Sequence, residues 1–123
     1  MRITADEARR FWDHRTQRRM GLDPAKLGDE GFVYLAAETL CLAFHRAPWP
    51  RVWMVHVGAE PEAWGNTVPQ AMSLLEDFWA EGDADRVVAW VEESNRPACA
   101  LARRCGFIED GRFPGVVMFG MEL

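Results

Sequence analysis

The stretch that decides the fold is VVAWVEESNRPACALARRCGFIEDG, which spans residues 87–111. Its apolar beginning, residues 87–91, is followed by acids and is typical of a buried strand. Asn95 is then predicted to cap a helix, because its side-chain oxygen can accept an N–H of the first turn, where Pro97 is tolerated. Apolar residues spaced three and four apart predict one buried helix face, made of Ala98, Leu101, Ala102 and Cys105. Gly106 is expected to end this helix in a left-handed conformation, before a second strand that reaches Gly111.

The composition narrows the class of protein. The chain has 123 residues, of which 49% are hydrophobic and 11% aromatic, so we expect a single domain, residues 1–123, with a packed core. The net charge of −5 argues against general affinity for nucleic acid. Several arginines do gather in the first nineteen positions, and we interpret them as a solvated helix face rather than a phosphate-binding one.

The cysteines and the hydropathy pattern bear on location. The three cysteines are odd in number and have no metal-ligand spacing, which favours a reducing compartment and no metal site. The N-terminus has no apolar signal core, and no apolar run approaches the roughly 18 residues of a membrane span. We therefore expect a cytoplasmic protein without a membrane partner.

Upstream of the deciding stretch, the pattern predicts a helix followed by three strands. The pair Thr4 and Glu7 forms a capping box that starts a helix over about residues 5–19, while a short helix at 25–27 stays undecided. Residues 32–36 and 40–45 are predicted to form an antiparallel hairpin. A third strand over residues 52–57 would place alternate side chains on one face, namely Val52, Met54 and His56.

A loop and a long helix connect these strands to the deciding stretch. The loop is expected over residues 58–65, and the helix over residues 68–79 with Pro69 in its first turn. Its apolar stripe is predicted to be core and comprises Val68, Ala71, Met72, Leu75, Phe78 and Trp79. A closing strand is expected over residues 116–122. The order of elements predicts an α/β fold with a central mixed, mostly antiparallel sheet flanked by helices.

The deciding stretch resembles a family signature. Its Asn95, its Ala98 and Leu101, the run from Arg103 to Phe107, and Gly111 are similar to the C-terminal motif of the GNAT superfamily of N-acetyltransferases. The resemblance covers about residues 32–123 and implies the acyl-CoA N-acyltransferase-like fold. It also implies transfer of an acetyl or acyl group from acetyl-CoA to a primary amine of a small-molecule or peptide acceptor. The short chain is similar to small members encoded by phages and prophages.

The same resemblance implies where coenzyme A would bind. A Gly-containing loop before a helix N-terminus is suited to anions, and in this family that junction holds the pyrophosphate of the cofactor. Counted onto this chain, the family motif falls on residues 62–67, where Gly65 agrees with it and Glu62 and Thr67 depart from it. The implied cofactor-binding residues are Val55 and Val57 through their backbone groups, with Trp64, Gly65, Asn66, Thr67 and Asn95.

For a catalytic base, His56 is the first candidate and Glu92 the second, with Glu60 behind them. The ordinary pKa of histidine, near 6.5, suits proton transfer. Each candidate also has a purely structural interpretation: a histidine satisfied within the sheet, or an acid solvated at a strand end. The tyrosine that the family often uses as an acid would fall on Ala102, and Tyr34, the single tyrosine, lies on a strand unsuited to that role.

An alternative of a different class is a catalytically inactive GNAT-fold module that acts as a protein-binding or phage-related structural or accessory protein. The missing tyrosine, Glu62 and the six tryptophans favour it. Three of these tryptophans are expected near the cleft as anchors, namely Trp49, Trp53 and Trp64. Binding of nucleic acid through the arginine-rich helix is a third and weaker interpretation. The apolar closing strand would allow a homodimer.

Overall fold

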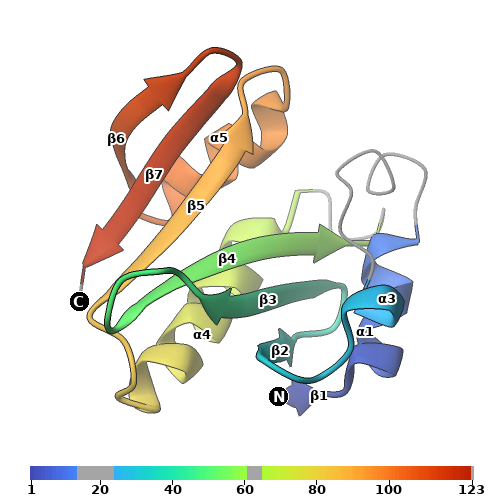
Figure 1. Cartoon of the computed structure of the whole chain (residues 1–123). Coiled ribbons are helices and arrows are strands. Elements are labelled where there is room, and N and C mark those ends of the chain that lie inside the picture. Colours follow the sequence, from blue (N-terminus) through green and yellow to red (C-terminus); the bar gives the residue numbers. More distant parts are fainter. Residues whose placement is uncertain (14–23, 61–64, 123) are drawn as a thin grey trace.

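A computed structural model describes residues 1–13, 24–60 and 65–122 of the chain. In this described part the strands form one seven-stranded sheet in the order β1-β2-β3-β4-β5-β7-β6 (Figure 1). The strands are β1 (Arg2–Ile3), β2 (Phe32–Ala36), β3 (Leu40–Arg46), β4 (Val52–Ala59), β5 (Arg86–Glu92), β6 (Ile108–Phe113) and β7 (Val116–Glu122). All neighbouring strands pair antiparallel except β4 and β5, which are parallel. The predicted mixed, mostly antiparallel sheet is therefore confirmed.

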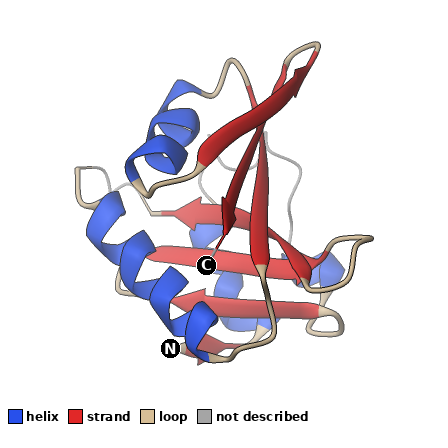
Figure 2. Ribbon diagram, turned by 90° about the vertical axis from the view of Figure 1, so that its left-hand side faces the viewer, coloured by secondary structure: helices blue, strands red, loops and turns tan. Residues whose placement is uncertain are grey.

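Helices cover both faces of the sheet. Figure 2 shows α4 (Thr67–Ala80) and α5 (Arg96–Arg104) on one side, and α1 (Ala5–Trp12) with the short α3 (Pro24–Leu27) on the other. Each side has its own buried cluster. The larger one joins the sheet to α4 and α5, and the smaller one packs α1 on β2 and β3. No helix of the described residues is long and apolar enough to cross a bilayer.

The deciding stretch forms the predicted strand, helix and strand. The side-chain oxygen of Asn95 accepts a hydrogen bond from the backbone N–H of Ala98, at 3.3 Å. At the other end of α5, Gly106 has a φ of +97°. The N–H of Phe107 donates to the carbonyl of Ala102 at 3.0 Å, and that of Gly106 to Arg103 at 3.1 Å. These two bonds form a Schellman motif, which glycine allows because it has no Cβ.

Two predicted boundaries were wrong. The capping box of Thr4 and Glu7 is present, but α1 ends at Trp12; the remainder of the predicted helix, residues 14–19, lies outside the described residues. The loop predicted to begin at Gly58 begins later, because β4 continues to Ala59. Gly58 is a packing residue: a Cβ built there would lie 2.5 Å from the ring of Trp12.

The long helix differs from its predicted stripe at one position. Ala71, Leu75 and Phe78 are buried as expected, but Met72 is 38% exposed, whereas Leu74 is buried. The buried residues, Ala71, Leu74, Leu75 and Phe78, follow the i, i+3, i+4, i+7 spacing of a single stripe, and Met72 lies outside it. The short strand β1, which pairs with β2, also has no signal in the sequence.

Candidate active site

The central feature of the site is the point where β4 and β5 separate. The two strands are described over their whole length, and they pair at three positions: Val52 with Arg86, Trp53 with Val87 and Met54 with Val88. Beyond these positions the strands diverge, as Figure 1 shows. The β5-facing edge of residues 55–57 is therefore not paired with β5, and an opening is left in the middle of the sheet.

A cavity of about 270 Å³ occupies this opening. Val55, His56 and Val57 border it from β4, and Glu92 borders it at the end of β5. The apolar stripe of α5 forms a further wall, through Ala98, Leu101, Ala102 and Cys105. Burial raises the pKa of the Cys105 thiol, which keeps this wall uncharged. The structure thus brings together the predicted base candidates, the predicted β4 backbone and the helix of the deciding stretch.

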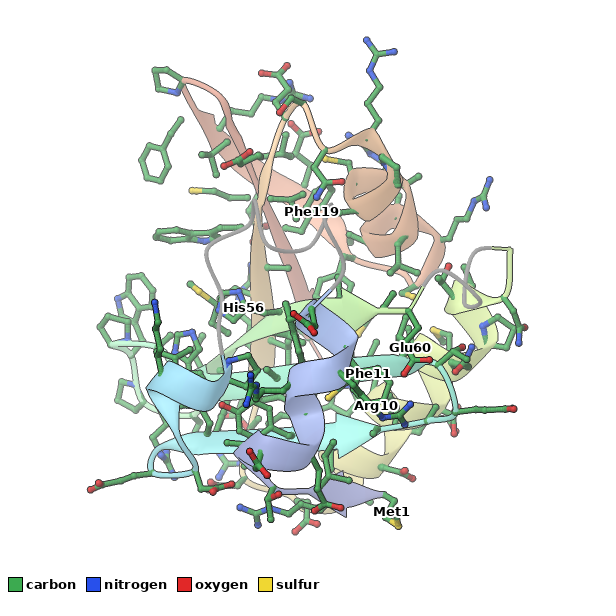
Figure 3. All side chains as sticks on the ribbon, turned by 90° about the vertical axis from the view of Figure 1, so that its right-hand side faces the viewer. Met1, Arg10, Phe11, His56, Glu60 and Phe119 are labelled. Carbon is green, nitrogen blue, oxygen red and sulfur yellow. The ribbon has the colours of Figure 1, made fainter. Side chains whose placement is uncertain are left out.

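His56 is one half of a histidine pair. Its Nε2 lies 2.9 Å from the Nε2 of His45 on β3, and the two rings meet edge to edge, with centroids 5.0 Å apart and planes inclined by 12°. Burial lowers the pKa of His56 to about 4, and the neighbouring His45 adds to this effect. His56 is therefore neutral at pH 7, and it is a weaker base than an exposed histidine. Figure 3 labels it on β4, within the sheet.

The carboxylates differ in their surroundings. Glu92 is exposed at the rim of the cavity. Glu60, the weaker base candidate, forms an ion pair with Arg10 of α1, and Figure 3 shows the two side chains pointing toward one another. This ion pair gives Glu60 a structural role, since it ties α1 to the end of β4.

The N-terminus of α4 holds the residues predicted to grip the cofactor phosphates. Gly65 has a φ of +92°, and Asn66 occupies the N-cap position without a side-chain capping bond. Thr67 begins the helix. Gly65, Asn66, Thr67 and Asn95 are not among the described residues that border the cavity, whereas Glu62 and Trp64 lie outside the described part of the chain.

The tryptophans at the cavity are not the predicted ones. Trp12 and Trp90 border it. Trp53 is instead buried against Phe78, with its Nε1–H donating to the carbonyl of Asp83 at 3.1 Å. Trp49 is 57% exposed in the turn before β4. Trp49 and Trp53, which were expected near the cleft, do not border this cavity.

Three other aspects of the site follow from the fold. Ala102, where the family often has a tyrosine, is 8% exposed and borders the cavity. Tyr34 donates its hydroxyl hydrogen to the carbonyl of Gly28 at 2.9 Å, on the α1 side of the sheet. Its burial raises its pKa to about 12.

Trp12 and Phe107 were not predicted as cavity residues, since each carries only an ordinary core signal in the sequence.

No protein-family model and no curated protein matches the sequence. Solved structures do resemble it. An acetyltransferase of the GNAT family from Bacillus anthracis aligns with a TM-score of 0.62 and 16% identity, covering 81% of this chain and 73% of that one. The GNAT domain of PAT from S. lividans aligns with a TM-score of 0.63 and 22% identity, covering 98% and 70%.

A third similar structure was solved with a cofactor bound. The microcin self-immunity acetyltransferase MccE, in complex with acetyl-CoA and AMP, aligns with a TM-score of 0.59 and 14% identity, covering 75% of this chain and 60% of that one. At these levels of identity the likeness concerns the arrangement of the elements. The diverging β4 and β5, the sheet order and the flanking helices together show that this chain has the fold of the GNAT acetyltransferases.

Proposed function

We propose that the protein is an acetyl-CoA-dependent N-acetyltransferase that acylates a primary amine. The observation that carries this proposal is the cavity between the diverging β4 and β5, bordered by the α5 stripe on one side and by His56 on another. The fold is that of enzymes with this activity, but fold alone does not establish a reaction. The site must therefore also fit an acyl-CoA and an amine.

The residues present fit an acyl-CoA. The unpaired backbone edge of residues 55–57 can bind the amide groups of the pantetheine arm as an added strand would. The apolar stripe of α5 suits the uncharged thioester end of that arm. The N-terminus of α4, where Asn66 forms no side-chain cap, offers backbone N–H groups to the pyrophosphate. When bound, acetyl-CoA would supply an activated acyl group.

His56 is proposed as the base that prepares the amine. An amine attacks only as the free base, so a proton has to leave the ammonium form of the acceptor. His56 borders the cavity, and its lowered pKa leaves it neutral at pH 7 with a lone pair that can receive that proton, while it also makes the ring a weaker base than an exposed histidine. Glu92 at the rim is the second candidate, and its charge also suits attraction of a cationic acceptor.

The first experiment measures binding. We expect acetyl-CoA to raise the melting temperature of the purified protein, because a ligand that binds only the folded state stabilises it. Acetate plus 3′-phospho-ADP, which keeps the pyrophosphate but lacks the pantetheine arm, is the matched control and should give a much smaller shift. If millimolar acetyl-CoA produced no shift, the proposed function would be overturned.

The second experiment measures turnover. Acetyl-CoA is incubated with a panel of primary amines and thiol release is followed. We expect His56→Ala to lower kcat by roughly 100-fold or more, within the range for general bases. Glu92→Gln tests the second candidate against Glu93→Gln, since Glu93 is exposed and paired with Arg112 at 2.8 Å, away from the cavity lining. Turnover that is indifferent to His56→Ala would remove the base assignment.

A binding module without catalysis is the second candidate function. It is favoured by two exposed aromatic side chains, Trp90 at 44% and Phe113 at 50% exposure, whose rings pack edge to face with centroids 5.7 Å apart. Aromatic pairs of this kind serve as anchors in protein interfaces. The absence of any effect of acetyl-CoA in the first experiment would favour this candidate.

A further inference from the structure

The histidine pair has a defined hydrogen-bond direction. His45 Nδ1 lies 3.2 Å from the carbonyl oxygen of Arg46. A carbonyl oxygen can only accept, so His45 Nδ1 carries the proton in this contact. In a neutral ring the other nitrogen, Nε2, is then an acceptor. The Nε2 of His56, 2.9 Å away, must therefore be the donor of the bond between the two rings.

The opposite arrangement is less favourable. If His45 Nε2 carried the proton and donated to His56, its Nδ1 lone pair would face the lone pairs of the Arg46 carbonyl at 3.2 Å. One hydrogen bond would be lost and replaced by a repulsive contact. The carbonyl of Arg46 thus determines the tautomer of His45, and His45 in turn determines that of His56.

The sheet holds the two rings in this arrangement. His45 and His56 occupy adjacent antiparallel strands, with Ala43 opposite His56 and Met54 opposite His45, so the two side chains are diagonal neighbours on one face. Their planes are 12° apart. The ring of Phe32 from β2 packs against His45 with centroids 5.2 Å apart. Neither ring can turn without losing this packing.

We propose that His45 is a positioning residue, which holds His56, a residue that borders the cavity, in its Nε2–H tautomer so that Nδ1 is the nitrogen left to accept a proton. The proposal rests on the proposed function, because acylation of an amine is the reaction in which Nδ1 of His56 would accept a proton. The proton step is simple: the acceptor ammonium loses one proton, His56 Nδ1 gains it, and the resulting imidazolium keeps its Nε2–H bond to His45.

Two substitutions of His45 separate its possible contributions. His45→Phe keeps an aromatic ring that can pack against Phe32 but removes the acceptor. His45→Gln introduces an amide oxygen that can accept the Nε2–H of His56. If His45 had only a structural role, the two variants should have a similar His56 tautomer and a similar kcat, or His45→Phe should be closer to the unmodified protein. The positioning role makes Gln the functional replacement and Phe the defective one.

The first test needs no ligand or activity. Long-range nitrogen–proton NMR correlations of the protein labelled with ¹⁵N-histidine report which ring nitrogen carries the proton. We expect His56 in the Nε2–H form in the unmodified protein and in His45→Gln, and a mixture of tautomers in His45→Phe. A His56 ring protonated on Nδ1 in the unmodified protein, or unchanged by His45→Phe, would overturn the proposal.

The second test measures the consequence for turnover. We expect His45→Phe to lower kcat by roughly 10- to 100-fold, as loss of an orienting partner does elsewhere, with the KM for acetyl-CoA unchanged. His45→Gln should restore most of the loss. Equal kcat in the Phe variant and the unmodified protein would overturn the positioning role. If the unmodified protein bound acetyl-CoA but acylated no amine, the proposed function would fail, and the NMR experiment would still decide the tautomer.

Discussion

The N-termini of α4 and α5 are built from the same residue types. Asn66 precedes α4 and Asn95 precedes α5, and each helix has a proline in its first turn, Pro69 and Pro97 respectively. Both helices also border the cavity. Yet the Asn95 side chain caps α5 through the N–H of Ala98, and the Asn66 side chain makes no such bond.

The position of the proline explains the difference. A capping side chain accepts from the second or third residue of the helix. In α5 the proline is second, so the third residue, Ala98, still offers an N–H. In α4 the proline is third and has no N–H to offer, so only the second residue, Val68, could donate, and Asn66, with a φ of −133° and a ψ of 28°, makes no side-chain bond to it. The N-terminus of α5 is thus capped by Asn95, and this helix serves as a wall of the cavity. The N-terminus of α4 is not capped by the side chain of Asn66. Backbone N–H groups at such a helix end can bind an anionic ligand.

The largest expected effect comes from a substitution on α5 that fills the cavity. Ala102→Trp places an indole in the cavity and should abolish the stabilisation by acetyl-CoA, a loss of about 2.7 kcal/mol at a concentration 100 times Kd. Arg104→Trp puts the same ring on the exposed side of α5 and should leave that stabilisation intact. Both are read from melting temperatures with and without ligand. A ligand shift that survives Ala102→Trp would show that α5 is not a wall of the binding site.

The next effect tests the caps. Asn95→Ala should lower the free energy of unfolding by about 1 kcal/mol, because it leaves the N–H of Ala98 without its partner. Asn66→Ala should change it by only a few tenths of a kcal/mol, since no capping bond is lost. Urea denaturation gives both values. Equal costs would contradict the distinction between the two ends.

The same pair of variants addresses the second role considered for Asn95. If Asn95 serves only as a cap, the affinity for acetyl-CoA, measured by calorimetry, should be unchanged in Asn95→Ala after the loss of stability is allowed for. A drop of tenfold or more in affinity would assign it a contact with the cofactor as well.

These two helix ends also show which features of the structure could be predicted from the sequence. The capped helix, its Schellman motif and its apolar stripe depend on residues within about ten positions of one another, and the sequence predicted all of them. Such features are local, since each residue type has one dominant physical reason to be there. The order of the elements along the chain followed from the same local signals, and the mixed sheet from that order together with the resemblance to the GNAT superfamily.

The site depends on contacts between distant segments, and there the sequence was less informative. The pairing of His45 with His56 arises from the register of β3 on β4, which no local pattern specifies. Trp12 reaches the cavity because α1 packs over Gly58, a glycine that the sequence suggested as a loop residue. Where β4 and β5 part is likewise a property of the sheet as a whole.

The smallest effect gives the sharpest test of the comparison. Pro69→Ala restores an N–H at the third position of α4, so Asn66 should then be able to cap that helix. The loss of proline also makes the unfolded chain more flexible, and this offsets part of the gain. The informative quantity is therefore the coupling in a double-mutant cycle of Pro69→Ala and Asn66→Ala. We expect Asn66→Ala to lower the free energy of unfolding by about 0.5–1 kcal/mol when residue 69 is alanine, and by almost nothing when it is proline.

Acetyl-CoA should also bind more weakly to Pro69→Ala than to the double variant, because the new cap competes with the phosphates for the same N–H groups. A coupling of zero would mean that something other than the place of the proline keeps Asn66 from capping α4.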